Sequence, residues 1–299
     1  MASKLKALSP GQVKPVRPKV LIFGKSGHGK TWASIDFPRA YYIDTEGGAT
    51  LPHYQEKLAA AGAVVMGVSE GALSLDTIIE QVRALATEKH DFKTLIIDSI
   101  TKVFQHEIAE EHERIVNKGH KDEFGASKKP AVAKMRQLVS WISRLDMNVI
   151  LIAHETAEWG KDSKGERTQI GYTFDAWEKL EYELDLCLQI FKQGNSRKAR
   201  VRKSRLIGFP ESEVIDWSAA EFARRYGQDV IEKDVDTLVL ATTEQVKELH
   251  YLLDTFKVDE ATRSKWLAAA KADDFSEMDT SAIEKCINFL KAKFQQPAA

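Results

Sequence analysis

A glycine-rich stretch directly follows the first apolar run of the chain. Residues 20–23 are apolar, and residues 24–31 then read GKSGHGKT, which matches the pattern G-x-x-x-x-G-K-[ST]. In this pattern a strand enters a loop whose backbone N–H groups surround phosphates, and its glycines leave the space that a Cβ would fill. A chance glycine turn is the alternative. The strand before the loop and the helix-compatible segment at 31–36 favour a nucleoside triphosphate site.

The residue types of this loop predict individual roles. Lys30 is expected to reach the β- and γ-phosphates, and the hydroxyl of Thr31 is expected to bind Mg²⁺. N–H groups of the loop and of the following helix favour negative charge. The residues expected to contact the nucleotide are Gly24, Lys25, Ser26, Gly27, His28, Gly29, Lys30, Thr31 and Trp32. The predicted ligand is ATP, with Mg²⁺ as its cofactor.

Composition narrows the class of protein further. Of the 299 residues, 43% are hydrophobic and 29% are charged, which is typical of a globular protein that can bury a full core. The formal net charge is −1, so a polyanion would need a local basic patch. Cys187 and Cys286 show no metal or redox spacing, residues 1–19 lack an apolar signal core, and no stretch is long enough to span a membrane. These features predict a cytoplasmic protein without a membrane partner.

Changes in pattern divide the chain into segments. Residues 1–18 are basic and contain prolines, which predicts a flexible arm, and residues 19–228 form the core. Apolar runs at 20–23, 40–43, 64–68, 94–97, 148–153 and 184–191 alternate with helical patterns at 75–89, 101–116 and 132–145. This alternation predicts an α/β fold with a mostly parallel sheet covered by helices on both faces. Residues 199–206 and 213–217 predict two antiparallel strands at the sheet edge.

The remaining segments carry no strand pattern. Residues 229–240 predict a charged linker, and residues 241–296 a small helical domain. Thr242, Asp259 and Ser281 are capping residue types that each precede an amphipathic stretch, which predicts three short helices. We expect this module to dock a protein or to pack on the core rather than to catalyse a reaction.

Acidic residues follow two of the predicted strands. Residues 95–98 read LIID, and Asp98 is expected to hold Mg²⁺ through water, the alternative being a strand-end turn. Ser99 follows Asp98, so a water-activating carboxylate must come from elsewhere. Glu46 lies just past the strand at 40–43 and is the predicted general base, the alternative being a turn acid beside two glycines. Asp44 is the second choice for the base and a candidate for the metal shell.

These motifs resemble those of the RecA-like recombinase ATPases, and more closely the compact phage relatives in the Sak group of single-strand annealing proteins. The resemblance covers about residues 19–217 and rests on IDTE at 43–46, LIIDS at 95–99, VILIAHE at 149–155 and VRKSRLIGFP at 201–210. It implies a RecA-like P-loop NTPase core, with the helical module appended at the C-terminus. His154 would then sense the γ-phosphate, although a lone histidine after a strand is often structural. The stretch 154–155 replaces the usual Asn-Gln pair, and the long N-terminal oligomerisation helix of RecA is missing.

Basic residues near the end of the core have two interpretations. Residues 197–205 contain six cations, which is typical of a charged edge strand that resists aggregation. If the segment is a strand, Lys203 and Arg205 share one face. The resemblance implies that this pair reaches the γ-phosphate in a neighbouring protomer and completes its ATP site.

Two basic segments are candidate DNA-binding loops. Residues 118–130 and 159–167 each mix cations, glycine and an aromatic residue, which suits backbone neutralisation and base stacking. The resemblance implies the same two places, after the helix that follows the Walker B motif at 95–99 and after the strand at 149–155 that ends in the γ-phosphate sensor. Solvated loops are the alternative. The candidate residues are Trp159, Lys161, Lys164 and Arg167, followed by Lys128 and Lys129.

The combined prediction is an ATP-dependent, single-stranded-DNA-binding recombinase or annealing protein of phage type. Its catalytic residues would be Lys30, Glu46, His154, Lys203 and Arg205, with ATP hydrolysed at protomer interfaces of a homo-oligomeric ring or filament. The helical module would dock a single-strand-binding protein, and a phage protein would act in the cytoplasm of its bacterial host. One alternative is an ATPase that acts on a protein partner, such as a helicase loader or a nucleotide switch. Another is a P-loop binding module with negligible turnover.

Overall fold

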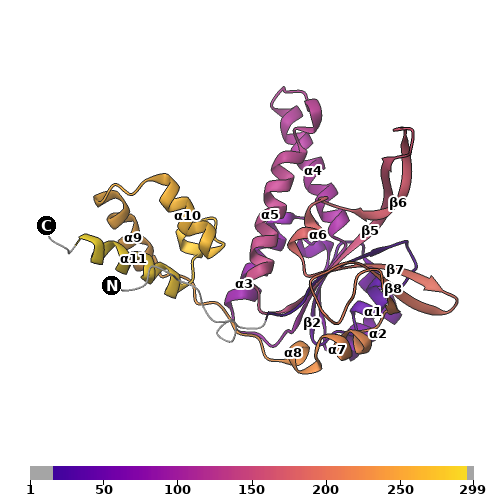
Figure 1. Ribbon diagram of the computed structural model, residues 1–299. Helices are drawn as coiled ribbons and strands as arrows, with labels where there is room; N and C mark the ends of the chain where they lie inside the picture. The colour runs from indigo at the N-terminus through magenta and orange to yellow at the C-terminus, as the bar shows by residue number, and fades with distance from the viewer. Residues whose placement is uncertain (1–15, 295–299) are drawn as a thin grey trace.

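The computed structural model describes residues 16–294 as an α/β core followed by C-terminal helices (Figure 1). The core contains a nine-stranded sheet. Its strands are β1 Lys19–Gly24, β2 Ala40–Asp44, β3 Val64–Met66, β4 Thr94–Asp98, β5 Asn148–Lys161, β6 Arg167–Asp175, β7 Leu186–Gln193, β8 Ser196–Ser204 and β9 Val214–Asp216. Within residues 16–294, no helix combines the length and the apolarity needed to cross a bilayer.

The sheet is mostly parallel, in the order β3-β2-β4-β5-β1-β7-β8-β9. Along this order the pairing is parallel from β3 through β2, β4, β5 and β1 to β7, whereas β8 and β9 are antiparallel additions at one edge. The ninth strand, β6, pairs antiparallel with β5. Every residue of β1 and of β4 is buried, which explains why these strands are near-continuous apolar runs. The predicted fold class is therefore confirmed, including the antiparallel edge.

Helices cover both faces of this sheet. They are α1 Lys30–Ser34, α2 Pro52–Ala60, α3 Leu75–Thr87, α4 Ile100–Asn117, α5 Lys128–Arg144, α6 Leu180–Glu183, α7 Ala219–Tyr226 and α8 Gln228–Glu232, with 3-10 turns η2 Gly48–Thr50, η3 Val68–Glu70 and η4 Glu123–Gly125. One buried cluster joins α3, α4 and α5 to the sheet, and a second joins α1, α2, α7 and α8 to the other face. Ser74 and Ser218 begin α3 and α7 by accepting hydrogen bonds from the N–H groups of Thr77 and Glu221.

A β-hairpin replaces the loop expected at 159–167. β5 does not end near residue 153 but continues to Lys161, and β6 returns antiparallel to it, so the hairpin projects from the core (Figure 1). From His154 to Asp175 its strand residues are half-buried or exposed, apart from the buried Phe174. The sequence prediction missed this hairpin because its strands pair with each other in solvent and carry no apolar run.

The segments at both ends of the core are more buried and make more contacts than their sequence indicates. Residues 1–15 of the predicted arm lie outside the described residues, but Arg17 is only 2% exposed. Its guanidinium donates to the carbonyls of Ile231 and Asp234 and pairs with Asp146 at 3.4 Å. The predicted linker at 229–240 begins within α8, and its Leu238 packs against the core. Burial of these few side chains fixes the path of a charged segment that lacks a strand pattern.

The C-terminal helices pack around a hydrophobic cluster of their own. They are α9 Thr243–Thr255, α10 Glu260–Ala270 and α11 Thr280–Phe294, with the 3-10 turn η5 Phe275–Glu277. The expected caps at Thr242 and Asp259 are present. α11, however, begins at Thr280, one residue before the expected cap Ser281, because the carboxylate of Asp279 accepts from the Ser281 N–H at 2.8 Å.

Candidate functional site

A cavity of about 830 Å³ lies at the carboxyl ends of the central parallel strands. Ligands of open α/β sheets bind at this edge. The lining residues are Gly24, Lys25, Ser26, Gly27, Gly29, Lys30, Thr31, Trp32, Tyr42, Asp44, Glu46, Gly48, Leu51, Tyr54, Asp98, Lys102, His154, Glu155 and Arg197. All residues predicted to bind the nucleotide line the cavity except His28, whose ring nitrogen Nδ1 lies 3.3 Å from the carbonyl oxygen of Ile190.

The loop between β1 and α1 adopts the conformation that its glycines permit. Gly27 and Gly29 have φ values of 74° and 82°, in the left-handed region that favours glycine. The ammonium group of Lys30 donates to the carbonyl oxygens of Gly24 at 2.7 Å and Lys25 at 3.1 Å. Burial lowers the pKa of Lys30, and nearby carboxylates such as Asp98 oppose that shift. Lys30 thus holds its amine at the mouth of the loop, where phosphate oxygens can replace the carbonyls.

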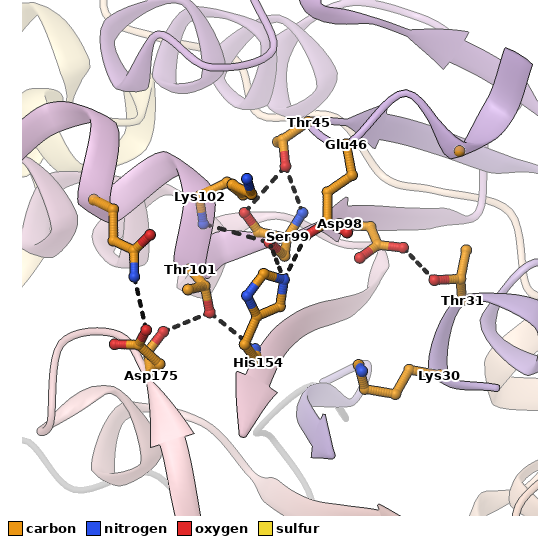
Figure 2. A network of polar contacts seen from close by, with 12 residues as sticks. Lys30, Thr31, Thr45, Glu46, Asp98, Ser99, Thr101, Lys102, His154 and Asp175 are labelled. Atoms are coloured by element: carbon orange, nitrogen blue, oxygen red, sulfur yellow. Dashed lines mark hydrogen bonds and ion pairs between the residues drawn. The ribbon is translucent and has the colours of Figure 1, made fainter. Parts of the chain in front are cut away.

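Asp98 meets Thr31 across the sheet edge (Figure 2). The Thr31 hydroxyl donates to Oδ2 of Asp98, and the Tyr42 hydroxyl donates to the same oxygen at 3.1 Å. Burial raises the pKa of Asp98 to about 6, against the opposing effect of these hydrogen bonds. A hydroxyl and a carboxylate are oxygen ligands of the kind that Mg²⁺ prefers.

This donor set fits Mg²⁺ as part of a nucleotide complex. Within residues 16–294 there is no group of three or more His, Cys, Asp or Glu side chains that could hold a metal ion by itself. Mg²⁺ commonly uses one or two protein ligands together with substrate phosphates and water. Thr31 and Asp98 therefore suit an ion that arrives with a phosphorylated ligand.

Glu46 lies beside Ser99 and His154 in the same cavity (Figure 2). The Ser99 hydroxyl donates to Oε1 of Glu46 at 2.8 Å, and Nε2 of His154 lies 2.5 Å from the same oxygen. Burial would raise the pKa of Glu46, but the hydrogen bonds from Ser99 and His154 outweigh it and lower the pKa. The carboxylate is therefore held ionised, as a general base requires.

Asp44 shapes the turn that presents Glu46. Its carboxylate accepts from the backbone N–H groups of Glu46 at 3.0 Å, Gly47 at 2.9 Å, Gly48 at 3.3 Å and Ala49 at 2.7 Å. Both of its oxygens are thus used within the turn, and the residue is only 2% exposed. Asp44 is therefore a positioning residue, because it holds the turn that carries Glu46.

The chain matches a known family across this whole region. A family model described as an AAA domain matches residues 17–218. The chain belongs to this AAA domain family. The match spans every strand of the sheet and every cavity residue named above, so the predicted P-loop ATPase class is confirmed. A search of curated proteins found no match.

Lys203 and Arg205 lie away from the nucleotide cavity of their own AAA domain. The ammonium of Lys203 donates to the carbonyl of Leu184, and Arg205 donates to that of Tyr182. The sequence placed the pair on one strand face, but β8 ends at Ser204, and the pairing register shifts between Cys187 and Leu188 opposite its last residues. This irregularity breaks the simple alternation along the strand. The role of the pair in a neighbouring protomer stays a prediction.

The candidate DNA-binding residues of the AAA domain lie on two projections. Trp159 and Arg167 lie on the hairpin, where the guanidinium of Arg167 stacks 4.8 Å from the ring centre of Trp159. Lys161 ends β5, and Lys164 lies in the hairpin turn. Lys128 and Lys129 lie in the first turn of α5 rather than in a loop, and Lys128 pairs with a glutamate at 3.2 Å. No candidate in either group lines the nucleotide cavity.

Several residues of this site escaped the sequence analysis. Ser99, Tyr42 and Tyr54 contact or border the acidic residues, and Arg197 approaches the loop from β8. Ser99 had a signal, because it directly follows Asp98. Tyr42, Tyr54 and Arg197 had none, since only strand pairing and helix packing bring them to the cavity.

Proposed function

We propose that this AAA domain protein is an ATP-dependent, single-stranded-DNA-binding recombinase or annealing protein that hydrolyses ATP between protomers. The observation that carries the proposal is the path of β5. This strand begins in the core, passes His154 at the nucleotide cavity, and extends to Trp159 on the projecting hairpin, where its pairing with β6 shifts register between Glu158 and Trp159. A change at the phosphate end can therefore reach the hairpin along one strand.

The cavity supports a hydrolytic reaction with defined roles. Glu46 would take a proton from the attacking water as the water oxygen bonds to the γ-phosphorus and the bond to the bridging oxygen breaks. Lys30 would offset the charge that develops on the phosphate oxygens. His154 would exchange its contact with Glu46 for one with the γ-phosphate, and so release the base when ATP is bound. Mg²⁺ bound by Thr31 and Asp98 would neutralise phosphate charge.

The hairpin has the chemistry of a single-strand binding surface. Trp159 is 53% exposed, although an aromatic ring of this size is usually buried. Arg167 stacks on this ring, and Lys161 and Lys164 lie nearby. A base can stack on an exposed indole, at about 1–3 kcal/mol per base, while cations neutralise the backbone.

Assembly into an oligomer would complete each ATP site. Lys203 and Arg205 would act on the ATP of a neighbouring protomer, and next to them Ile207 is fully exposed. An exposed isoleucine beside a cation pair suits a contact with a second copy. The helical module would then dock a single-strand-binding protein.

A protein partner is the second candidate function. The hairpin also exposes Ile170 at 60% and Tyr172 at 41%, and exposed apolar side chains suit protein docking as well. Such an ATPase would bind its partner on the hairpin without DNA.

The deciding experiment measures ATP hydrolysis with and without single-stranded DNA, together with DNA binding over a range of salt concentrations. Wild-type protein should be stimulated by DNA and bind it less tightly as salt rises. W159A should lose about tenfold or more in DNA affinity while keeping its basal ATPase rate. Y182A, which changes an exposed aromatic residue of α6, outside the hairpin strands, is the matched control and should bind DNA normally. Equal ATPase rates with and without DNA, and no salt-sensitive binding, would refute the DNA role and favour the protein partner.

A further inference from the structure

Arg197 reaches the nucleotide cavity from the β7–β8 hairpin of the same chain. It is the second residue of β8, and it lines the cavity together with Gly29 and Lys30. Its Nε atom is buried and has no hydrogen-bond partner. A buried guanidinium nitrogen without a partner costs free energy, unless a ligand supplies the acceptor.

The contact with the phosphate loop is close. A Cβ added to Gly29 would lie 2.1 Å from Nε of Arg197, so the side chain fills the space that this glycine leaves open. Tyr54 lines the same cavity. Burial raises the pKa of Tyr54, and the positive charge of Arg197 works against that shift. Arg197 thus packs against Gly29 of the loop, and its charge acts on Tyr54 in the same cavity.

The other arginines of β8 have protein partners. Arg202 pairs with Glu158 at 3.1 Å and donates to the carbonyl of Tyr172 at 3.0 Å. Arg200 stacks on Phe191, with its guanidinium carbon 5.7 Å from the ring centre. Within residues 16–294, Arg197 makes no such ion pair or ring contact. Its unpartnered Nε atom lies beside the loop where phosphate oxygens would bind.

We propose that Arg197 binds the α- and β-phosphates of a nucleotide held in the same chain. This assignment rests on the proposed use of the cavity for ATP. The N–H groups of a P-loop cradle the α- and β-phosphates, and Arg197 packs on one residue of that cradle, Gly29. Glu46, in the turn after β2, and His154, in β5, lie in contact elsewhere in the cavity and would mark its γ-phosphate end. A guanidinium can bind phosphate oxygens through two parallel hydrogen bonds.

This role differs from the one predicted for Lys203 and Arg205, which would act on the nucleotide of a neighbouring protomer. Lys203 and Arg205 would respond to the γ-phosphate of a neighbour and would therefore affect turnover and assembly. Arg197 would act within one chain on phosphates that ATP and ADP share. Its loss should weaken both nucleotides equally, in monomer and oligomer alike.

The test measures the affinities of ADP, a non-hydrolysable ATP analogue and inorganic pyrophosphate by titration calorimetry with Mg²⁺. R197Q should weaken binding of all three by about 10- to 100-fold, the effect of losing a charge-assisted hydrogen bond. R197K keeps the charge and should recover part of the affinity. R200Q alters an exposed arginine of the same strand and should bind all three as the wild type does. Thermal melting of each variant confirms that it is folded.

Three results would overturn the assignment. A loss confined to the ATP analogue would place Arg197 at the γ-phosphate. A loss for ADP but not for pyrophosphate would place it on the base or ribose. Unchanged affinities in both Arg197 variants would give it a structural role only. Wild-type protein that binds no nucleotide would refute the ATP site itself, so the two failures are told apart before any variant is compared.

Discussion

Asp98 should destabilise the metal-free fold, and replacing it with asparagine should stabilise the protein. The carboxylate lies at the end of β4 and is only 6% exposed, and burial raises its pKa from 3.8 to about 6. A shift of about 2 units corresponds to about 3 kcal/mol, at 1.36 kcal/mol per unit. D98N keeps an oxygen that can accept from Thr31 and Tyr42 but removes the buried charge.

The sign of the pH dependence follows from the direction of the shift. A carboxyl whose folded pKa is raised is held protonated by the fold. Its ionisation therefore costs no stability below pH 3.8, costs more as the pH rises toward about 6, and costs the full amount above that value. D98N should therefore melt about 5–10 °C higher than the wild type at pH 8 and at nearly the same temperature at pH 4.

The assay is thermal unfolding in EDTA without nucleotide, so that no Mg²⁺ neutralises the carboxylate. D216N is the control, because Asp216 is an exposed partner of Lys198, and its loss should change stability by less than about 1 kcal/mol. D98N should also lose Mg²⁺-dependent ATP hydrolysis. A lower melting temperature of D98N at pH 8, or an equal gain at pH 4 and pH 8, would refute the reasoning.

Other expected outcomes test the remaining parts of the site and the fold. E46Q should lower the turnover number about 10²- to 10⁴-fold while ATP affinity by calorimetry stays unchanged, and full turnover would exclude Glu46 as the base. S99A removes a hydrogen bond that lowers the pKa of Glu46, so the acid limb of its pH–rate profile should move to higher pH; an unmoved limb would contradict that contact. G29A forces a Cβ into the left-handed region and against Arg197, and should abolish most ADP binding without unfolding the protein by circular dichroism. L253A, at a fully buried position of α9, should cost about 2–5 kcal/mol in urea unfolding of the helical module, and a smaller cost would show that the cluster collapses around the gap.

Most of the sheet could be predicted because its strands are buried on both faces. β1 and β4 are continuous apolar runs. Short runs of this kind between helical segments are typical of buried parallel strands. The β5–β6 hairpin could not be predicted in the same way, because beyond residue 153 its strands are solvated and pair with each other. Its existence depends on pairing between residues such as Trp159 and Gln169, which no local pattern displays.

The acidic part of the site could be predicted because parallel strands end together. Asp44 lies beside Asp98 in the β2–β4 register, and Gly24 beside His154 in the β1–β5 register. Residues that follow different strands therefore meet at one edge of the sheet. The sequence could not show how those residues bind one another. Asp44 was a candidate for the base or the metal shell, yet its carboxylate is used by the turn that carries Glu46.

By itself, the sequence determined the phosphate loop, the Mg²⁺ ligand candidates and the positions of most core strands along the chain, because each depends on local residue types and their spacing. Tertiary structure alone decided which cation of the basic stretch at 197–205 lines the nucleotide cavity. Lys203, Arg205 and Arg197 belong to one basic stretch, and the resemblance singled out the first two and gave Arg197 no role. The register of β8 against β7 directs the first two to carbonyl groups outside the cavity and brings Arg197 against Gly29. Pairing between strands determines which of these cations reaches the cavity, and no local sequence pattern indicates that pairing.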